Sequence, residues 1–216
     1  MTGVFAFAGI HIHAGLTDYT NWLNSQGGIN GHRVQYVMED TGYQVDRSVA
    51  TFKKISGSTP PCCYYGDSTG FMKAIAAELS SSNSMLMSGA SFATALTEVD
   101  QHPFQFIPGP SYSQMFSIIM EYIASEAKGG KKPTIAFVYS DTEFGRDPIA
   151  NGRARAKELG IEVVEEIMTK PGSVDVSADV IKLRRKRPDY VLFHGYVLSP
   201  INEFMVQMRQ MGLNTK

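Results

Sequence analysis

The sequence predicts an α/β protein made of two lobes, each a doubly wound parallel sheet flanked by helices. Three observations support this fold class. Short runs rich in β-branched and aromatic residues alternate with helical patterns along the chain. Several of these runs are continuously apolar, which is typical of strands buried on both faces. Polar loops follow the runs, at the places where open parallel sheets bind ligands.

The clearest predicted strand is Pro133–Tyr139, a continuous apolar run rich in β-forming residues. It stops at the polar loop Ser140–Gly145, and a helix is expected to begin near Arg146–Pro148, because proline suits the first turn of a helix. This loop carries one aromatic ring at the carboxyl end of a buried strand. We therefore interpret it as a candidate binding edge.

The rest of the chain follows the same alternation. We predict further strands over Arg33–Glu39, Pro61–Tyr65, Met85–Met87, Phe104–Ile107, Ile161–Ile167 and Asp189–Phe193. Helices are expected over Gly9–Gln26, after the cap Asp46, after Gly70, after the cap Ser111, up to Leu159, over Val176–Arg187 and from Pro200. Pro108-Gly109-Pro110 is the strongest break in the pattern. It divides the chain into an N-terminal lobe, residues 1–108, and part of a C-terminal lobe, residues 109–216.

Composition excludes several classes of function. The 216 residues carry a net charge of -1, which gives no indication of a nucleic-acid or acidic-membrane partner. No apolar run approaches the roughly 20 residues of a membrane-spanning helix. The start of the chain also lacks the basic residues and long apolar core of a secretory signal.

No cofactor or metal is expected. The two cysteines, Cys62 and Cys63, are adjacent, and neighbours in a strand point to opposite faces, so an ordinary disulfide between them is not predicted. A metal site would need further Cys or His at ligand spacing. The glycine-rich fingerprints of dinucleotide and phosphate loops are absent from the sequence as well.

One pattern suggests an enzyme. Gly66-Asp67-Ser68-Thr69-Gly70 matches the Gly-x-Ser-x-Gly turn of serine hydrolases, and Asp141 and His194 follow in the chain order of such a triad. The glycine-rich oxyanion loop of those enzymes is missing, and Asp141 and His194 would lie in the other lobe. A serine hydrolase that uses Ser68 is therefore an alternative hypothesis, and catalysis is not the preferred one.

The same loops favour a binding site. Hydroxyls and backbone N–H groups at a strand end and a helix start are suited to an anion or a carboxylate. Ser68 and Thr69 lie in one such loop, and Ser88-Gly89-Ala90-Ser91 provides a second. Phe144 and Tyr196 occupy the corresponding loops of the second lobe, where they are expected to cover the apolar part of a ligand.

The order of these motifs resembles the branched-chain amino-acid-type periplasmic binding proteins, the type I solute-binding proteins of ABC importers. The resemblance covers essentially the whole chain. It lies in Gly27-Gly28-Ile29-Asn30-Gly31, Glu39-Asp40, the loops of Ser68 and Ser91, Asp141–Gly145 in the pattern Asp-x-x-aromatic-Gly, and Asp189–Tyr196.

This resemblance implies a type I two-lobed fold and a non-catalytic, extracytoplasmic binder that delivers a small carboxylate-bearing ligand to a membrane permease. The ligand would be a branched-chain or other hydrophobic amino acid, or an aromatic acid. The implied ligand-binding residues are Ser68, Thr69, Ala90, Ser91, Phe92, Asp141, Phe144 and Tyr196. Because the same fold also serves in receptors, a ligand-sensing domain is a further alternative.

Two positions depart from the family pattern. Phe92 stands where a threonine is common, and Ala8 stands where an aromatic residue is common. Both changes count against a branched-chain amino acid and suit a ligand of a different shape, such as an aromatic one. The resemblance also implies that the chain is a fragment, because family members begin with a central strand before Thr2 and continue after Lys216. A periplasmic location, or an extracytoplasmic lipoprotein, is likewise implied by the family alone.

Overall fold

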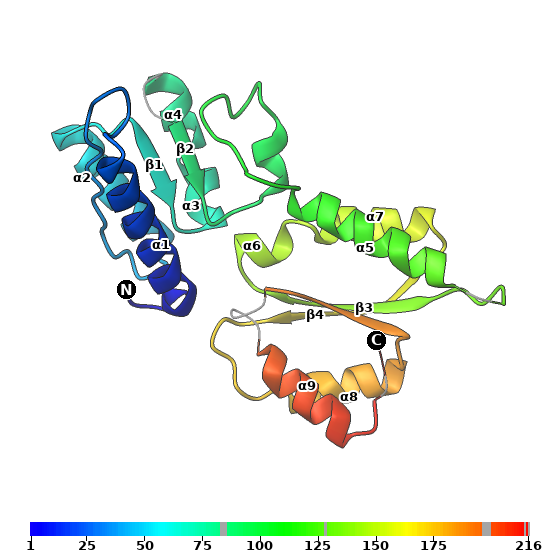
Figure 1. Cartoon of the computed structure of the whole chain (residues 1–216). Coiled ribbons are helices and arrows are strands. Elements are labelled where there is room, and N and C mark those ends of the chain that lie inside the picture. The colour runs from blue at the N-terminus through cyan, green and yellow to red at the C-terminus, as the bar shows by residue number, and fades with distance from the viewer. Residues whose placement is uncertain (83–85, 128, 196–199, 214, 216) are drawn as a thin grey trace. The chain divides into compact units, whose positions relative to one another are not determined.

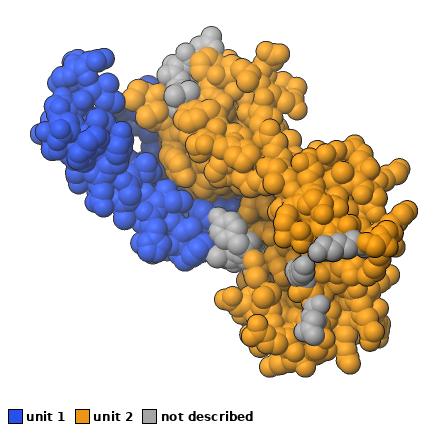
Figure 2. Space-filling view, turned by 45° about the vertical axis from the view of Figure 1, so that its right-hand side comes forward, with its two compact units in different colours: residues 1–61 blue, residues 62–216 orange. Residues whose placement is uncertain are grey.

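The computed structural model describes residues 1–82, 86–127, 129–195, 200–213 and 215. Its contacts divide the chain into two compact units, Met1–Pro61 and Cys62–Lys216, which Figure 2 shows in different colours. The division by contacts falls at residue 61, and the lobe boundary expected near residue 108 stays a prediction. Within the described ranges, no helix is long and apolar enough to cross a membrane.

The first unit holds two helices, α1 (Ala6–Ser25) and α2 (Val45–Ser58). α2 begins after Gln44, so the predicted cap at Asp46 is wrong by two residues. Between the helices, Asn30 and Gly31 adopt positive φ angles of 50° and 81°, which is typical of an Asn-Gly turn. The turn is closed by a bridge between Ile29 and His32.

The strand predicted over Arg33–Glu39 is not formed. The Asn24 side chain instead bonds both backbone groups of Val34, donating to the carbonyl and accepting from the amide, each at 2.8 Å. A strand needs a neighbour for its backbone groups, and none of the described residues pairs with this segment as a strand.

The second unit begins with β1 (Cys63–Gly66), α3 (Thr69–Ala74), α4 (Ala76–Ser82), β2 (Leu86–Gly89) and the 3₁₀ turn η1 (Thr94–Thr97). β1 and β2 are parallel, with Gly66 beside Gly89 at their carboxyl ends. The strand predicted at Phe104–Ile107 is reduced to one bridge from Gln105 to Met87. Met85 of the predicted strand Met85–Met87 lies outside the described residues.

The remainder of this unit contains α5 (Tyr112–Glu126), β3 (Thr134–Ser140), α6 (Glu143–Arg146), α7 (Ile149–Glu158), β4 (Glu162–Thr169), α8 (Ser177–Lys186), β5 (Tyr190–His194) and α9 (Ile201–Gln210). The three strands form a parallel sheet in the order β4-β3-β5. α5 and α7 cover one face and α8 and α9 the other, as Figure 1 shows. This arrangement confirms the doubly wound sheet that the sequence predicted.

The core explains why β3 is the central strand. Ile135 and Phe137 face α5 and α7, whereas Ala136 and Val138 face α8 and α9. All four residues are fully buried. Burying a side chain such as that of Phe137 contributes roughly 1.5 to 3 kcal/mol, so the run of apolar residues fixes the strand between two helical layers. The loop that follows β3 is thereby held at the carboxyl edge of the sheet.

Candidate ligand-binding site

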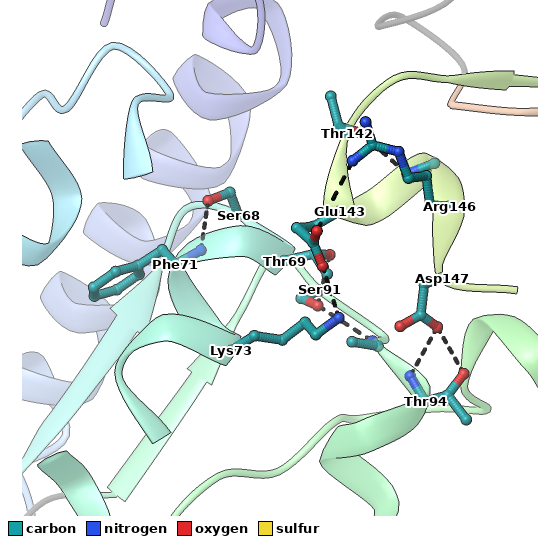
Figure 3. A network of polar contacts seen from close by, with 12 residues as sticks. Ser68, Thr69, Phe71, Lys73, Ser91, Thr94, Thr142, Glu143, Arg146 and Asp147 are labelled. Carbon is teal, nitrogen blue, oxygen red and sulfur yellow. Dashed lines mark hydrogen bonds and ion pairs between the residues drawn. The ribbon is translucent and has the colours of Figure 1, made fainter. Parts of the chain in front are cut away.

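Three buried hydroxyls lie where β1 and β2 end. Ser68, Thr69 and Ser91 are 3%, 1% and 0% exposed. Ser68 is in extended conformation and caps α3, because its Oγ accepts a hydrogen bond from the Phe71 amide at 3.2 Å (Figure 3). Thr69 begins the helix, and Ser91 follows β2. The parallel pairing of the two strands thus brings two separate polar loops to one edge.

The three hydroxyl groups carry three hydrogens, and the described residues around them provide too few acceptors to pair all three. The Oγ1 of Thr69 and the Oγ of Ser91 are 2.8 Å apart and share one hydrogen, and the Ser91 Oγ also accepts from the Ala93 amide at 3.2 Å. One of the two hydroxyl hydrogens, and that of Ser68, therefore meet no acceptor among the described residues. Leaving such buried donors unpaired costs roughly 1 to 3 kcal/mol each. Two O–H groups are thus available to an external acceptor.

Ala90 and Phe92, on either side of Ser91, make other contacts. The Ala90 amide donates to the Gly66 carbonyl at 3.0 Å, so it extends the β1–β2 pairing. The half-buried Phe92 ring packs against Tyr112, with ring centroids 6.0 Å apart, and the Phe92 carbonyl accepts from the Tyr112 amide. These contacts attach the loop after β2 to the start of α5.

The loop after β3 is bonded mainly to itself and to α3. Asp141 forms an ion pair with Arg146. Thr142 caps α6 by accepting from the Gly145 amide at 3.0 Å, and its hydroxyl lies 2.9 Å from that of Ser140. Glu143 pairs with Lys73, and the hydrogen bond from the Lys73 ammonium lowers the pKa of Glu143.

Phe144 lies in an aromatic cluster and is 7% exposed. Its ring centroid is 5.0 Å from that of Tyr112 and 4.5 Å from that of His194. Burial lowers the pKa of His194, against the opposing effects of the Phe144 carbonyl and the Asp147 charge. The neutral ring therefore donates its Nε2–H to the Phe144 carbonyl at 3.0 Å. Tyr196, the other ring that the sequence analysis assigned to the ligand, lies outside the described residues.

The structure adds contacts that the sequence analysis did not identify. Lys73 Nζ lies 2.7 Å from Glu143 Oε2, and the Asp147 carboxylate accepts from both the amide and the hydroxyl of Thr94, at 2.9 and 2.6 Å (Figure 3). The Thr94 hydroxyl is also 2.7 Å from that of Ser113. We call these contacts the polar bridge. Its partners are 70 and 53 residues apart, so no local pattern could reveal them.

The groups of the hypothetical hydrolase triad are not assembled. The Ser68 hydroxyl bonds the Phe71 amide, Asp141 bonds Arg146, and His194 bonds the Phe144 carbonyl. Within the described part of the chain, no hydrogen bond joins any two of the three. A nucleophile needs its base within hydrogen-bond reach, and this geometry does not provide it.

The fold is shared with solved structures of transport proteins. A branched-chain amino acid ABC transporter protein from Thermus thermophilus with bound valine has a TM-score of 0.90 at 24% identity, covering 100% of this chain and 55% of that one. A fatty acid ABC transporter substrate-binding protein from Thermomonospora curvata has a TM-score of 0.87 at 20% identity, covering 99% and 53%. A leucine complex of a Desulfitobacterium hafniense ABC transporter substrate-binding protein has a TM-score of 0.73 at 17% identity, covering 100% and 61%.

The chain spans between about half and three-fifths of the length of these proteins. No curated protein matches the sequence. The family model described as periplasmic binding protein matches residues 1–216, which is the whole chain. With the parallel, doubly wound sheet and the polar strand ends already described, this match establishes the family. The chain belongs to the periplasmic binding proteins and has their type I fold.

Proposed function

We propose that the chain is part of the extracytoplasmic substrate-binding component of an ABC importer. The protein would work in the periplasm, or outside the cytoplasmic membrane as a lipoprotein. It would bind a small ligand that carries a carboxylate and deliver it, unaltered, to a membrane permease. The ligand would be a branched-chain or other hydrophobic amino acid, or an aromatic acid. Family membership and the valine and leucine complexes of two structurally similar proteins support the amino acid class.

The two O–H groups without an acceptor carry this proposal. They come from Ser68 and from the Thr69–Ser91 pair, and all three side chains are buried. A carboxylate accepts several hydrogen bonds at once, and hydrogen bonds to a charged group contribute roughly 1.5 to 3 kcal/mol each. A neutral amide provides a weaker acceptor. The site is therefore expected to select ligands by their carboxylate.

Two of the candidate residues have a different proposed role. Ala90 donates its amide within the sheet and so would position Ser91, without itself binding the carboxylate. Phe92 packs on Tyr112 and would shape the edge of the site. Asp141, Phe144 and Tyr196 stay predicted ligand contacts from the loops after β3 and β5.

Isothermal titration calorimetry can test the proposal. The panel consists of valine, leucine, phenylalanine, benzoate and a long-chain fatty acid, each compared with its amide. Binding of at least one acid, with much weaker binding of its amide, is the expected result. A panel without any binding acid, or equal affinity for acid and amide, would contradict the proposal.

One pair of variants tests the residues. The double variant Thr69→Val/Ser91→Ala removes both hydroxyls of the pair, and with them the O–H group that the pair offers, and is expected to weaken carboxylate binding roughly 10- to 150-fold. Thr97→Val is the matched control, because Thr97 is exposed and its hydroxyl donates to the Thr94 carbonyl. Unchanged affinity in the double variant would show that this pair of hydroxyls does not bind the carboxylate.

A further inference from the structure

The second unit contains two separate sheets, β1-β2 and β4-β3-β5, and no strand pairing joins them among the described residues. The described chain passes once from the first sheet to the second, through Pro108-Gly109-Pro110 between η1 and α5. The arrangement of the two sheets therefore depends on contacts made by side chains and loops. The polar bridge supplies such contacts, and it places two of them on one short helix, α6.

α6 is held at both of its ends. Glu143, its first residue, accepts a hydrogen bond from the Lys73 ammonium of α3 at 2.7 Å. Asp147, which directly follows α6, accepts from the amide and the hydroxyl of Thr94 in η1 at 2.9 and 2.6 Å (Figure 3). Lys73 and Thr94 belong to the part of the chain that carries the first sheet. Because α6 is a single turn of four residues, its movement away from that sheet would break both contacts.

The same movement would take apart the candidate ligand-binding site. Lys73 lies four residues after Thr69 on α3, so the two side chains share one face of that helix. Glu143 directly precedes Phe144, a predicted ligand contact. The ion pair of Lys73 and Glu143 therefore holds the loop after β3 close to the loop that carries Thr69. The proposed function needs both loops, because it takes ligand contacts from each.

We propose that these two contacts open and close together, as one latch that sets how often the carboxylate site is complete. The latch consists of α6 with its Lys73–Glu143 and Thr94–Asp147 contacts. This inference rests on the proposed function and adds a control of its affinity. A ligand that touches both loops binds only when the latch is closed, so its apparent dissociation constant is the intrinsic one divided by the closed fraction. Linkage then requires that the ligand also stabilises the closed latch.

The latch residues are positioning residues, and one of them reports on opening. The side chains of Lys73 and Glu143 are 37% and 50% exposed, so their ion pair changes an equilibrium constant by at most about fivefold. Both hydrogen bonds from Thr94 end on the Asp147 Oδ2, a charged acceptor, and are therefore stronger. The Thr94 amide keeps this bond only while the latch is closed. Its exchange with solvent deuterium therefore measures opening, and a substitution at Lys73 leaves both partners of the bond intact.

Amide exchange followed by nuclear magnetic resonance tests the latch in the intact chain. Lys73→Met removes the ammonium and nearly keeps the length of the side chain. We expect the Thr94 amide to exchange about two- to fivefold faster in this variant, and calorimetry to show a carboxylate affinity reduced by up to the same factor. A saturating acid from the calorimetry panel should slow Thr94 exchange in the parent. Lys182→Met is the matched control, because Lys182 pairs with Asp179 at the same 2.7 Å within α8 and should change neither result.

Three results would overturn the latch. An unchanged Thr94 exchange rate in Lys73→Met would show that the two contacts open independently. Equally faster exchange of buried β3 amides, such as that of Val138, would assign the effect to unfolding of the whole unit. If an acid bound in calorimetry but left Thr94 exchange unchanged, the latch would not control the site. A panel without any binding acid would contradict the proposed function, whereas the exchange of Thr94 in Lys73→Met would still decide whether the two contacts open together.

Discussion

The loops that follow β1 and β2 differ from the loop that follows β3 in how their polar side chains are hydrogen-bonded. All three lie at the carboxyl edge of a parallel sheet. The first two loops contain buried hydroxyls with hydrogens that meet no acceptor in the described chain. The third is occupied by its own contacts, since Asp141 bonds Arg146, Glu143 bonds Lys73, and Phe144 packs on His194. Residues at equivalent positions after their strands therefore have different hydrogen-bonding surroundings. We expect substitutions of the hydroxyl residues in the first two loops to weaken carboxylate binding, and substitutions in the third loop to have their largest effect on the free energy of unfolding.

The largest effect is expected from Phe144→Ala. The ring is nearly buried between Tyr112 and His194, so its removal leaves a cavity and should lower the free energy of unfolding by about 3 to 5 kcal/mol. Urea denaturation followed by circular dichroism measures this change. Phe92→Ala, at a half-buried ring, is the comparison and should cost less. If Phe92→Ala lowered the free energy of unfolding more than Phe144→Ala does, the loop after β3 would not be the one that contributes more to stability.

Two helix caps provide a matched pair. Ser68 and Thr142 each accept a hydrogen bond from an amide three residues on, at 3.2 and 3.0 Å. Ser68→Ala and Thr142→Ala should therefore each lower the free energy of unfolding by about 1 kcal/mol. Only Ser68→Ala is expected to weaken binding of the carboxylate as well, in calorimetry at a temperature where both variants are folded. An equal loss of affinity in Thr142→Ala would erase the distinction between the loops.

The aromatic cluster should make stability depend on pH. Burial holds the pKa of His194 below its usual value, so the unfolded chain takes up the proton at a higher pH than the folded chain does. The free energy of unfolding therefore rises with pH between the lowered pKa of His194 in the folded chain and its ordinary value of about 6.5 in the unfolded chain. It falls as the pH drops below about 6.5. Denaturation midpoints measured between pH 5 and 8 test this. His194→Gln keeps a side-chain N–H and should flatten the profile; an unchanged slope would point to other groups.

The smallest effect is expected at the ion pair of the polar bridge. The side chains of Lys73 and Glu143 are 37% and 50% exposed, so water screens their attraction. A double-mutant cycle with Lys73→Met and Glu143→Gln should give a coupling of about 0.2 to 1 kcal/mol that decreases in 1 M salt. A larger coupling, insensitive to salt, would show that the pair contributes more than a surface ion pair normally does.

The strands of the second unit could be predicted because burial dictates their composition. The run Pro133–Tyr139 corresponds to β3, Thr134–Ser140, and Ile161–Ile167 and Asp189–Phe193 correspond to β4 and β5. The central run of β3 is apolar because helices cover both faces of the sheet, whereas the edge strand β4 also contains Glu162, Glu165 and Glu166. The segment Arg33–Glu39 has a similar composition but no partner strand among the described residues. Composition records the tendency to form a strand, and it cannot supply the neighbour that completes the hydrogen bonds.

The candidate site was predictable only in part, for a related reason. Ser68, Thr69 and Ser91 could be found because strand ends are recognisable, and two neighbouring parallel strands bring their ends together. The bond between Thr69 and Ser91 confirms that these two loops meet. The contacts of Lys73 and Thr94 follow from the packing of distant segments, which no periodic pattern encodes. An aromatic residue after a strand can pack in the core or contact a ligand, and the sequence does not distinguish the two. The packing of Phe144 against Tyr112 and His194 could therefore be seen only in the structure.

Gly66 and Gly89 lie side by side at the ends of β1 and β2, just before the loops that carry the buried hydroxyls of Ser68, Thr69 and Ser91. A Cβ on Gly89 would lie 2.9 Å from the Gly66 carbonyl oxygen, and a Cβ on either glycine would lie 2.8 Å from the Met72 Sδ. A methyl group on Gly89 would thus push apart the two strand tips whose loops carry Thr69 and Ser91, whereas one on Gly66 would displace only side-chain atoms of Met72, Phe71 and Met87. Under the proposed function, ligand selectivity would then depend on Gly89, a residue with no side chain to contact the ligand. Evolution or design could change ligand selectivity by altering the distance between the ends of β1 and β2, without replacing any residue that contacts the ligand.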